Sequence, residues 1–287
     1  SVIIPNYNCL DFLPKAIDSV MMQKGVNCEI IIVDDGSTDG SVDWLLKQQV
    51  RNPQIRLIAQ ANQGVIAARN RAIKAASAPY IAFLDADDFW YKDKLEKQIN
   101  YFKANPSCGL SFTNYDHLTM NYEYIIDCYG YWPEFSKHKN KSQGNYVCLD
   151  DAVNFLLTTN VIGTSCVVVR KSTILEAGGF DPSLRSASDW DCWLRIALIS
   201  DIAYTADNTM GYLMRPNSIT SNRQKRLDAI EDIINRIGQH ETVSEKAKEH
   251  AKAWLLESYG EMYRENQNYL NSMKFSLKAW RLYPHMR

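Results

Sequence analysis

Short apolar runs and amphipathic segments alternate along the first 113 residues of the chain. Runs of β-branched and aromatic residues predict strands, and apolar positions three and four residues apart predict helices. The predicted strands cover residues 1–5, 29–33, 55–59, 80–84 and 109–113, and an amphipathic segment follows each of the first four. Alternation at this spacing is typical of an α/β fold, with a mostly parallel sheet flanked by helices on both faces.

The pattern is less regular after residue 113. Residues 115–147 have the composition of a loop, and their aromatic cluster at 129–132 suits a lid or an acceptor wall as well as an ordinary surface loop. The remaining predicted elements are strands at 164–169 and 202–205 and helices at 150–157, at 174–177 and from residue 188.

From about residue 222 the helical period is continuous, which predicts a C-terminal helical appendage used for packing or self-association. We therefore expect one α/β domain over residues 1–221, with halves 1–113 and 114–221, and the appendage over residues 222–287.

The predicted strand at 80–84 ends abruptly in three carboxylates, Asp85, Asp87 and Asp88. Asp85 and Asp87 are one residue apart, so on an extended chain both project to the same side. Two such carboxylates repel each other unless a cation lies between them or one takes up a proton. Because open α/β sheets bind ligands at the carboxyl ends of their strands, a divalent cation shared with substrate phosphates would neutralise the pair. The alternative is a solvated acidic turn with an Asp as a helix cap.

Two further loops, residues 5–8 and 34–37, follow predicted strands and should reach the same sheet edge. A carboxylate such as Asp35 can accept a hydrogen bond from the imide of uracil or from ribose hydroxyls. Its alternative role is to close a turn and cap a helix. Residues 62–70 begin a helix, where backbone N–H groups and Arg69 can bind an anion, although small residues there also suit close packing on the sheet.

Composition excludes several classes of protein. Of the 287 residues 46% are hydrophobic, enough for a full core, and the net charge of -1 argues against a nucleic-acid partner. Seven cysteines without a Cys-Xaa-Xaa-Cys pair predict free thiols in a reducing compartment. No apolar stretch is long enough to span a bilayer and no signal peptide is visible, so we expect a cytoplasmic location.

Four motifs taken together resemble the amino-terminal half of glycosyltransferase family 2. They occur in that family's order and spacing, and they are SVIIPNYN, IVDDGSTD, NQG followed by ARN, and FLDADD. The resemblance implies a GT-A fold, which is Rossmann-like, and a nucleotide-diphosphate-sugar donor. A UDP-sugar is favoured over donors that carry other bases. It also implies Mn²⁺ or Mg²⁺ as a cofactor.

The resemblance assigns roles to the residues that match these motifs. Asp85 and Asp87 match the family's Asp-Xaa-Asp, which binds the ribose and the metal that bridges the diphosphate, and Asp87 is the implied metal ligand. The loop at Pro5 and the carboxylate at Asp35 are implied to hold the nucleotide base. The full set implied to bind the nucleotide sugar is Pro5, Asn6, Tyr7, Asp35, Asn62, Gly64, Arg69, Asp85 and Ala86.

The second half is similar to the family's acceptor region in GTS at 163–165, GGFD at 178–181 and SDWD at 188–191. This similarity implies acceptor-side positions at Thr164, Trp190 and Asp191. It assigns the catalytic base to Asp189, which a place in the first turn of a helix would keep ionised. Ser188 replaces the Glu that usually precedes this Asp, and Asp191 is the rival candidate for the base.

The expected function is that of an inverting, metal-dependent glycosyltransferase. Its acceptor would be a glycan, a glycoprotein or a lipid-linked sugar in the assembly of a polysaccharide or another surface glycan, at the cytoplasmic side of a membrane. Peripheral membrane contact and self-association through the C-terminal helices both stay open, although the mixed charge of those helices favours packing in solution. The rival functions are a glycosyltransferase-like scaffold that binds a nucleotide or glycan without turnover, and a nucleotidyltransferase that releases pyrophosphate.

Overall fold

The computed structural model describes residues 1–139, 141–142, 144–215 and 223–284. The chain divides into two compact units. Unit 1 comprises residues 1–149, 161–181 and 199–215, and unit 2 comprises residues 150–160, 182–198 and the described part of 216–287. Two segments expected in the α/β domain therefore group with the C-terminal helices. The expected domain boundary at 221–222 lies outside the described residues.

Unit 1 is built on a ten-stranded sheet with the order β3-β2-β1-β4-β9-β6-β10-β5, in which β7 also pairs with β6 and β8 with β10. The strands are β1 (Val2–Asn6), β2 (Ile30–Asp34), β3 (Ile55–Ala59), β4 (Tyr80–Phe83), β5 (Phe89–Trp90), β6 (Cys108–Leu118), β7 (Tyr124–Asp127), β8 (Val147–Cys148), β9 (Val168–Arg170) and β10 (Asp201–Leu213). The helices of the same unit are α1 (Leu13–Met21), α2 (Ser41–Arg51), α3 (Val65–Ala75), α4 (Lys94–Ala104), α5 (Cys128–Tyr131), α6 (Pro133–Lys139), the 3₁₀ turn η1 (Thr164–Cys166) and α8 (Lys171–Glu176).

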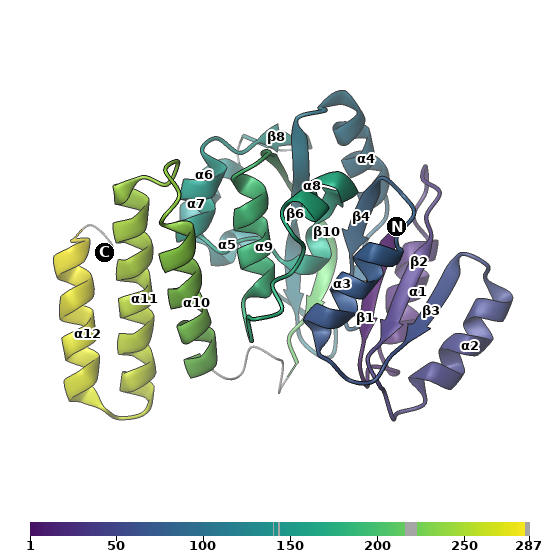
Figure 1. Ribbon diagram of the computed structural model, residues 1–287, viewed down its shortest axis with the longest axis horizontal. Coiled ribbons are helices and arrows are strands. Elements are labelled where there is room, and N and C mark those ends of the chain that lie inside the picture. Colours follow the sequence, from purple (N-terminus) through teal and green to yellow (C-terminus); the bar gives the residue numbers. More distant parts are fainter. Residues whose placement is uncertain (140, 143, 216–222, 285–287) are drawn as a thin grey trace. The chain divides into compact units, whose positions relative to one another are not determined.

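The first half of the sheet is parallel, as predicted. β2 lies between β1 and β3, and β1 also pairs with β4, all in parallel. Every residue of β2 is buried, which is expected of a strand covered on both faces. α3 packs on β1 and β2, and α2 lies along β3 (Figure 1). Small buried residues on α3, Ala68 and Ala72, allow this close approach.

The other half of the sheet is mixed, so the expectation of a mostly parallel sheet holds only for the β3-β2-β1-β4 side. β9 lies antiparallel between β4 and β6, and β10 runs parallel to β6 but antiparallel to β5 and β8. β10 is also longer than the strand predicted at 202–205. Asp207 and Asn208 interrupt its apolar pattern, and the strand continues past them because register shifts absorb the irregularity.

The described part of residues 115–147 contains strands and helices, contrary to the predicted loop. β6 continues into this segment, and β7, α5, α6 and β8 follow. Tyr129 is fully buried, its hydroxyl donates to the Thr205 carbonyl at 2.9 Å, and its ring packs on that of Phe135. This aromatic residue therefore belongs to the core, whereas Tyr131 two positions later is 62% exposed.

Unit 2 is helical. It contains α7 (Ala152–Thr158), α9 (Ser188–Ala197), α10 (Arg223–Ile237), α11 (Glu245–Glu265) and α12 (Tyr269–Leu282). α10, α11 and α12 lie side by side in a row (Figure 1). The Ser244 hydroxyl caps α11 by accepting the Ala247 N–H at 3.2 Å.

Two chain-wide expectations concern thiols and membranes. No disulfide joins the seven cysteines, all of which fall within the described ranges. None of the helices that the structure describes is both long and apolar enough to cross a membrane.

Candidate active site

Three polar segments meet at one edge of the sheet in unit 1. β2, β1 and β4 are parallel neighbours, so the segments that follow their carboxyl ends lie together, as predicted. We call these segments, residues 5–8, 34–37 and 85–88, the strand-end cluster. Open α/β sheets bind their ligands at this position.

Asn6 and Asp34 join the first two segments of the strand-end cluster. Both side chains are buried, and the Asn6 amide donates to Asp34 Oδ2 at 2.7 Å and to Ser37 Oγ at 3.2 Å. Asn6 Oδ1 is buried without a hydrogen-bond partner among the described residues, which leaves an acceptor for a ligand N–H or O–H. Of its neighbours in sequence, Pro5 is half-buried and Tyr7 is 50% exposed.

Asp35 is buried and holds the loop that leads into α3. Its Oδ1 accepts from the Gln60 side-chain amide at 2.7 Å and from the Gln63 N–H at 2.8 Å, and its Oδ2 accepts the Gly64 N–H at 2.7 Å. Two backbone N–H groups expected to bind an anion are therefore held by Asp35 instead, while Asn62 is exposed. A carboxylate has about four acceptor sites, so Asp35 keeps about one for a nucleotide.

Gly64 is required at the start of α3 by its backbone conformation. Its φ of 88° and ψ of 161° form a combination that residues with a Cβ adopt only under strain. Since its N–H donates to Asp35, this conformation links the loop to the strand-end cluster.

Asp85–Asp88 form a turn, so the expectation that an extended strand aligns Asp85 with Asp87 is wrong. β4 ends at Phe83, and the Asp88 N–H donates to the Asp85 carbonyl at 3.0 Å. The two carboxylates still repel each other. Burial raises the pKa of Asp87, and the charge of Asp85 raises it further. Ala86 between them is buried.

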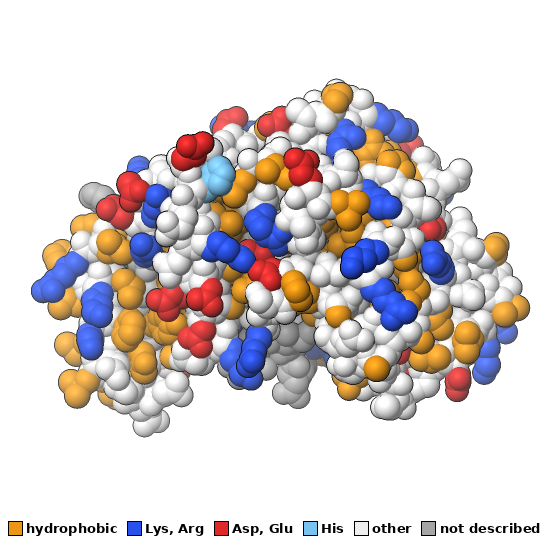
Figure 2. Space-filling model, in the orientation of Figure 1, with side chains coloured by type: hydrophobic (Ala, Val, Ile, Leu, Met, Phe, Trp, Pro, Cys, Tyr) orange, Lys and Arg blue, Asp and Glu red, His pale blue; other side chains and the backbone are white. Residues whose placement is uncertain are grey.

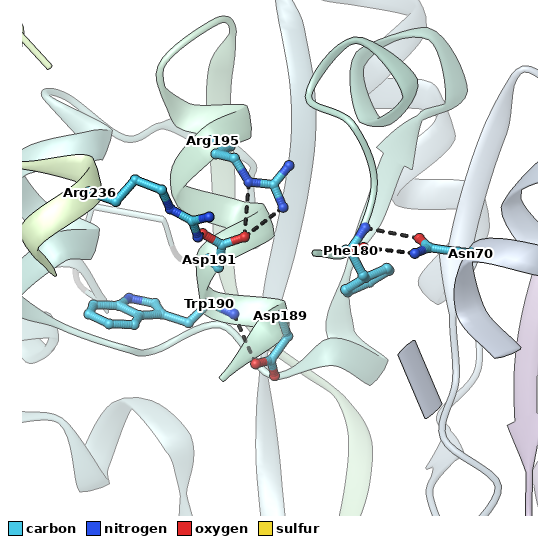
Figure 3. Close-up of polar contacts among 7 residues, drawn as sticks. All are labelled: Asn70, Phe180, Asp189, Trp190, Asp191, Arg195 and Arg236. Carbon is cyan, nitrogen blue, oxygen red and sulfur yellow. Dashed lines mark hydrogen bonds and ion pairs between the residues drawn. The ribbon is translucent and has the colours of Figure 1, made fainter. Parts of the chain in front are cut away.

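Arg69 of α3 holds Asp85. Its Nη2 lies 2.6 Å from Asp85 Oδ1, and its guanidinium lies 5.4 Å from the ring centroid of Phe180. The next residue, Asn70, donates to the Phe180 carbonyl at 2.7 Å and accepts the Phe180 N–H at 3.0 Å (Figure 3). A Cβ on Gly179 would lie 2.8 Å from Asn70 Oδ1. The ARN and GGF motifs therefore contact each other within unit 1, and this contact positions Arg69 toward Asp85.

Asp87 pairs with Arg215, a residue absent from the predicted site. Arg215 Nη1 lies 2.8 Å from Asp87 Oδ2 and 3.4 Å from Cys9 Sγ, and the guanidinium lies 4.7 Å from the Phe12 ring centroid. The Arg215 charge opposes the rise in the pKa of Asp87 that burial and Asp85 produce. Arg215 follows the end of β10, and because this strand was predicted to end at residue 205, no sequence signal linked Arg215 to the strand-end cluster.

Asp88 and Ser165 fix the turn to η1. Ser165 Oγ donates to Asp88 Oδ2 at 2.6 Å and accepts the Asp85 N–H at 3.0 Å. Burial, together with the charges of Asp87 and Asp85, raises the pKa of Asp88 well above its usual range. Thr164, predicted on the acceptor side, precedes Ser165 in η1 and is buried.

The carboxylates of this turn suit a hard divalent cation that a ligand completes. Within the described part of the chain, no group of three or more His, Cys, Asp or Glu side chains is arranged to hold a metal ion. Asp85 and Asp87 keep 31% and 32% of their side-chain surface exposed. Because Mg²⁺ and similar ions are commonly held by one or two carboxylates plus substrate phosphates, the turn fits such an ion together with a phosphate-bearing ligand. At Asp87 the ion would compete with Arg215.

In unit 2, α9 begins at Ser188 and carries Asp189 in its first turn, as predicted (Figure 3). Asp189 is half-buried, and its Oδ1 accepts the Trp190 N–H at 2.9 Å. Trp190 is 3% exposed, and its indole N–H donates to the Leu156 carbonyl at 2.8 Å. Asp189 is thus the accessible carboxylate of this turn, and Trp190 packs on α7.

Asp191 is enclosed by two arginines (Figure 3). Its side chain is 0% exposed, Arg195 Nη2 lies 2.6 Å from its Oδ2, and Arg236 of α10 binds its Oδ1. This arrangement joins α9 to α10 and gives Asp191 a packing role inside unit 2.

Comparison with known proteins identifies the class to which this fold and this cluster belong. The family model described as Glycosyl transferase family 2 matches residues 1–157. The putative teichuronic acid biosynthesis glycosyltransferase TuaG of Bacillus subtilis (strain 168) is 34% identical over 228 residues, which make up 78% of this chain and 82% of that protein. Other relatives are longer: the match covers 30% of an uncharacterized glycosyltransferase of Rickettsia felis and 18% of the chondroitin synthase of Pasteurella multocida. The chain belongs to glycosyltransferase family 2 and is a glycosyltransferase.

Two solved structures share the fold at low sequence identity. TarS 1–349 of S. aureus, in complex with UDP-GlcNAc, has a TM-score of 0.68 and 18% identity, and the match covers 98% of this chain and 82% of that one. The mannosyltransferase PcManGT of Pyrobaculum calidifontis, in complex with GDP-Man and Mn²⁺, has a TM-score of 0.69 and 17% identity over 98% of this chain and 74% of that one. These matches confirm the expected GT-A glycosyltransferase fold.

Proposed function

We propose that this chain transfers a sugar from a UDP-sugar to an acceptor hydroxyl, with inversion at the anomeric carbon and a divalent cation on the diphosphate. The observation that carries the proposal is the turn at the end of β4, where Asp85 and Asp87 each engage one arginine and remain about a third exposed. The nucleotide sugars bound to TarS and PcManGT, and the Mn²⁺ in PcManGT, support this donor class and a metal.

The donor side of the proposal rests on acceptor atoms and cations at the strand-end cluster. The orphaned Asn6 Oδ1 and the remaining acceptor site of Asp35 suit the imide N–H of uracil and ribose hydroxyls. Asp87 would hold Mn²⁺ or Mg²⁺, which when bound neutralises charge that develops on the departing UDP. Arg69 and Arg215 already lie at the same turn, so each can pair with a diphosphate oxygen once it leaves its Asp.

Asp189 is the proposed general base. It would take the proton of the acceptor hydroxyl as that oxygen attacks the anomeric carbon from the face opposite the leaving UDP, which inverts the configuration. The family resemblance supports this role, and so does its place as a half-buried carboxylate in the first turn of α9. The relative named for teichuronic acid biosynthesis supports a role in polysaccharide assembly. We propose that the product is a surface glycan and that it is assembled at the cytoplasmic side of a membrane.

The first test is thermal stabilisation by UDP, GDP, dTDP and CDP, each with and without Mn²⁺. We expect a shift that requires both UDP and Mn²⁺, since a ligand at about 100 times its Kd stabilises the folded state by ~2.7 kcal/mol. Asp87→Asn should remove the part of the shift that depends on Mn²⁺. Asp207→Asn is the matched control, because Asp207 pairs with Lys97 on the surface of the same unit. Absence of a shift with every nucleotide would overturn the proposed donor site.

Turnover separates the proposal from its rivals. Incubation with a panel of UDP-sugars and acceptors should release UDP and form a glycoside of inverted configuration. UDP binding without hydrolysis or transfer in any mixture would indicate a non-catalytic scaffold. Release of pyrophosphate from a nucleoside triphosphate would indicate a nucleotidyltransferase.

A further inference from the structure

The inner face of α12 packs closely on α11. Ala279 is 2% exposed, and the Phe275 ring lies 5.4 Å from that of Tyr259 and 5.3 Å from that of Tyr263. A Cβ on Gly260 of α11 would lie 2.9 Å from Ser276 Oγ, which shows how near the two helices approach. This face accounts for the folding of α12 as part of unit 2.

The outer face of α12 is apolar and exposed. Leu270, Met273, Leu277 and Trp280 are 84%, 71%, 48% and 58% exposed. Their spacing of three and four residues places them in one stripe, opposite the face that packs on α11. Helices of soluble proteins normally expose charged residues there, so this stripe needs a partner.

All the charge of α12 is positive and lies along one border of the stripe. Lys274 follows Leu270 by four residues, and Arg281 follows Leu277 by four, so each cation adjoins the stripe, with Lys278 one turn from Lys274. These three cations are exposed, and the helix contains no Asp or Glu from Tyr269 to Leu282. Hydrophobic and basic side chains lie together over α12 at the left of Figure 2, whereas acidic side chains gather over α10 and α11.

This one-sided charge favours an anionic surface over an antiparallel α12 from a second copy of the chain. In an antiparallel pair of α12 helices from two copies of the chain, the basic border of one would face the basic border of the other, and α12 offers no carboxylate to offset the repulsion. An anionic surface meets the cations with opposite charge while the apolar stripe leaves water. The mixed charge expected to favour packing in solution belongs to α10 and α11, not to α12.

We propose that α12 is a membrane-surface helix that binds anionic phospholipid. The helix would lie in the plane of the interface, with Leu270, Met273, Leu277 and Trp280 in the headgroup and acyl boundary and Lys274, Lys278 and Arg281 on lipid phosphates. The proposal does not depend on the donor or the reaction, and its test requires neither.

The test is flotation of the whole chain with vesicles of phosphatidylglycerol and phosphatidylethanolamine, compared with vesicles of phosphatidylcholine alone. We expect binding to the anionic vesicles that weakens as salt rises from about 0.1 M to about 0.5 M. Leu270→Ser with Leu277→Ser should weaken binding at least about tenfold, because it removes buried apolar surface. Lys274→Gln with Lys278→Gln should weaken it about fivefold for each Lys, and only for the anionic vesicles.

α2 of unit 1 supplies matched controls. Leu46 and Val50 are 50% and 87% exposed, and Lys47 and Arg51 are exposed on the same helix. Leu46→Ser with Val50→Ser, and Lys47→Gln with Arg51→Gln, should leave vesicle binding unchanged.

Three outcomes would overturn the proposal. They are equal binding by the native chain and the α12 variants, loss of binding in the α2 variants alone, and no preference for phosphatidylglycerol. Light scattering adds a separate readout. If the native chain is a dimer that does not bind vesicles, and Leu270→Ser with Leu277→Ser converts it to a monomer, the stripe is a self-association face and the proposal is wrong. Far-ultraviolet circular dichroism checks that each variant keeps its helices.

Discussion

Carboxylates form ion pairs with arginines in both units of the chain, but the two regions differ in how much of the carboxylate side chain is exposed to solvent. At the strand-end cluster of unit 1, Asp85 and Asp87 each engage one arginine and keep 31% and 32% of their side-chain surface exposed. In α9 of unit 2, Asp191 binds an arginine through each oxygen and has 0% of its side chain exposed.

The difference separates a carboxylate that can change partners from one that cannot. Breaking a buried ion pair leaves a charge with neither water nor a counter-ion, which costs several kcal/mol. Asp191 therefore stabilises the packing of unit 2. Asp87 is exposed to the repulsion of Asp85, and this repulsion persists at some cost to stability, as is typical of groups that bind a ligand. The predictions below test this contrast.

The largest effect is expected from Asp87→Asn. Transfer should fall about a thousandfold, because the variant loses the proposed metal ligand beside the departing diphosphate. The free energy of unfolding should stay the same or rise slightly, because the repulsion from Asp85 is relieved. kcat/KM for transfer and urea unfolding measure the two effects, with Asp207→Asn as the surface control. Native activity in Asp87→Asn would remove the metal role of this residue.

The next prediction contrasts the two carboxylates of α9. Asp191→Ala should lower the free energy of unfolding by about 3 kcal/mol, because it leaves Arg195 and Arg236 without the carboxylate that joins α9 to α10. Asp189→Asn should leave stability within about 0.5 kcal/mol but reduce transfer about a hundredfold or more, because it removes the proposed base. Urea unfolding and transfer assays of both variants check the contrast. The reverse pattern, with stability lost at Asp189 and activity lost only at Asp191, would exchange their roles.

Sequence alone predicted the parts of unit 1 that depend on short, continuous patterns. β1, β2 and β4 are buried apolar runs and β3 is a partly exposed one, so their positions follow from composition within a few residues. Because these strands are parallel, the meeting of the segments after them was also predictable. The carboxylates Asp35, Asp85 and Asp87 were found in this way.

Contacts between distant segments were not predictable from such patterns. The turn at Asp85–Asp88 depends on Ser165, which lies 80 residues beyond Asp85. Arg215 reaches Asp87 across 128 residues, and only because β10 continues through its register shifts. Asp35 looked free to bind a nucleotide, since no local signal showed that the loop before α3 would occupy three of its acceptor sites.

The comparison extends to pH through Lys94, a buried lysine that has no carboxylate partner among the described residues. Lys94 is 0% exposed, its ammonium donates to the Gln98 amide oxygen at 2.8 Å, and burial lowers its pKa to about 7. Lysine in the unfolded chain titrates near 10.4, so between about pH 7 and pH 10 the unfolded state binds the extra proton. Its contribution to stability should therefore rise with pH across this window, by at most ~1.4 kcal/mol per pH unit.

The Lys94 contribution is measured as the pH dependence of unfolding by urea. Lys94→Met should flatten the rise between about pH 7 and pH 10, since no titrating group then remains at this position. Lys97→Met on the same helix is the control, because the Lys97 side chain is 51% exposed and its removal should preserve the slope. Identical slopes in the native chain and Lys94→Met would contradict the prediction.

The smallest effect is expected from Ser165→Ala, because Ser165 is a neutral side chain that holds the Asp85–Asp88 turn in place. Ser165→Ala removes the hydroxyl that donates to Asp88 and accepts the Asp85 N–H, so we expect a loss of about 1–2 kcal/mol in the free energy of unfolding. The donor KM should rise several-fold more than kcat falls, because the turn that presents Asp85 loosens. Ser111→Ala is the matched control, because Ser111 is also fully buried. The Gln98 amide that donates to the Ser111 hydroxyl also donates to two backbone carbonyls, so it keeps acceptors in the variant. Loss of the Ser111 hydroxyl should therefore cost less than about 0.5 kcal/mol. Equal losses in the two variants, with no change in donor KM, would mean that Ser165 contributes only to packing and that the turn holds its shape without it.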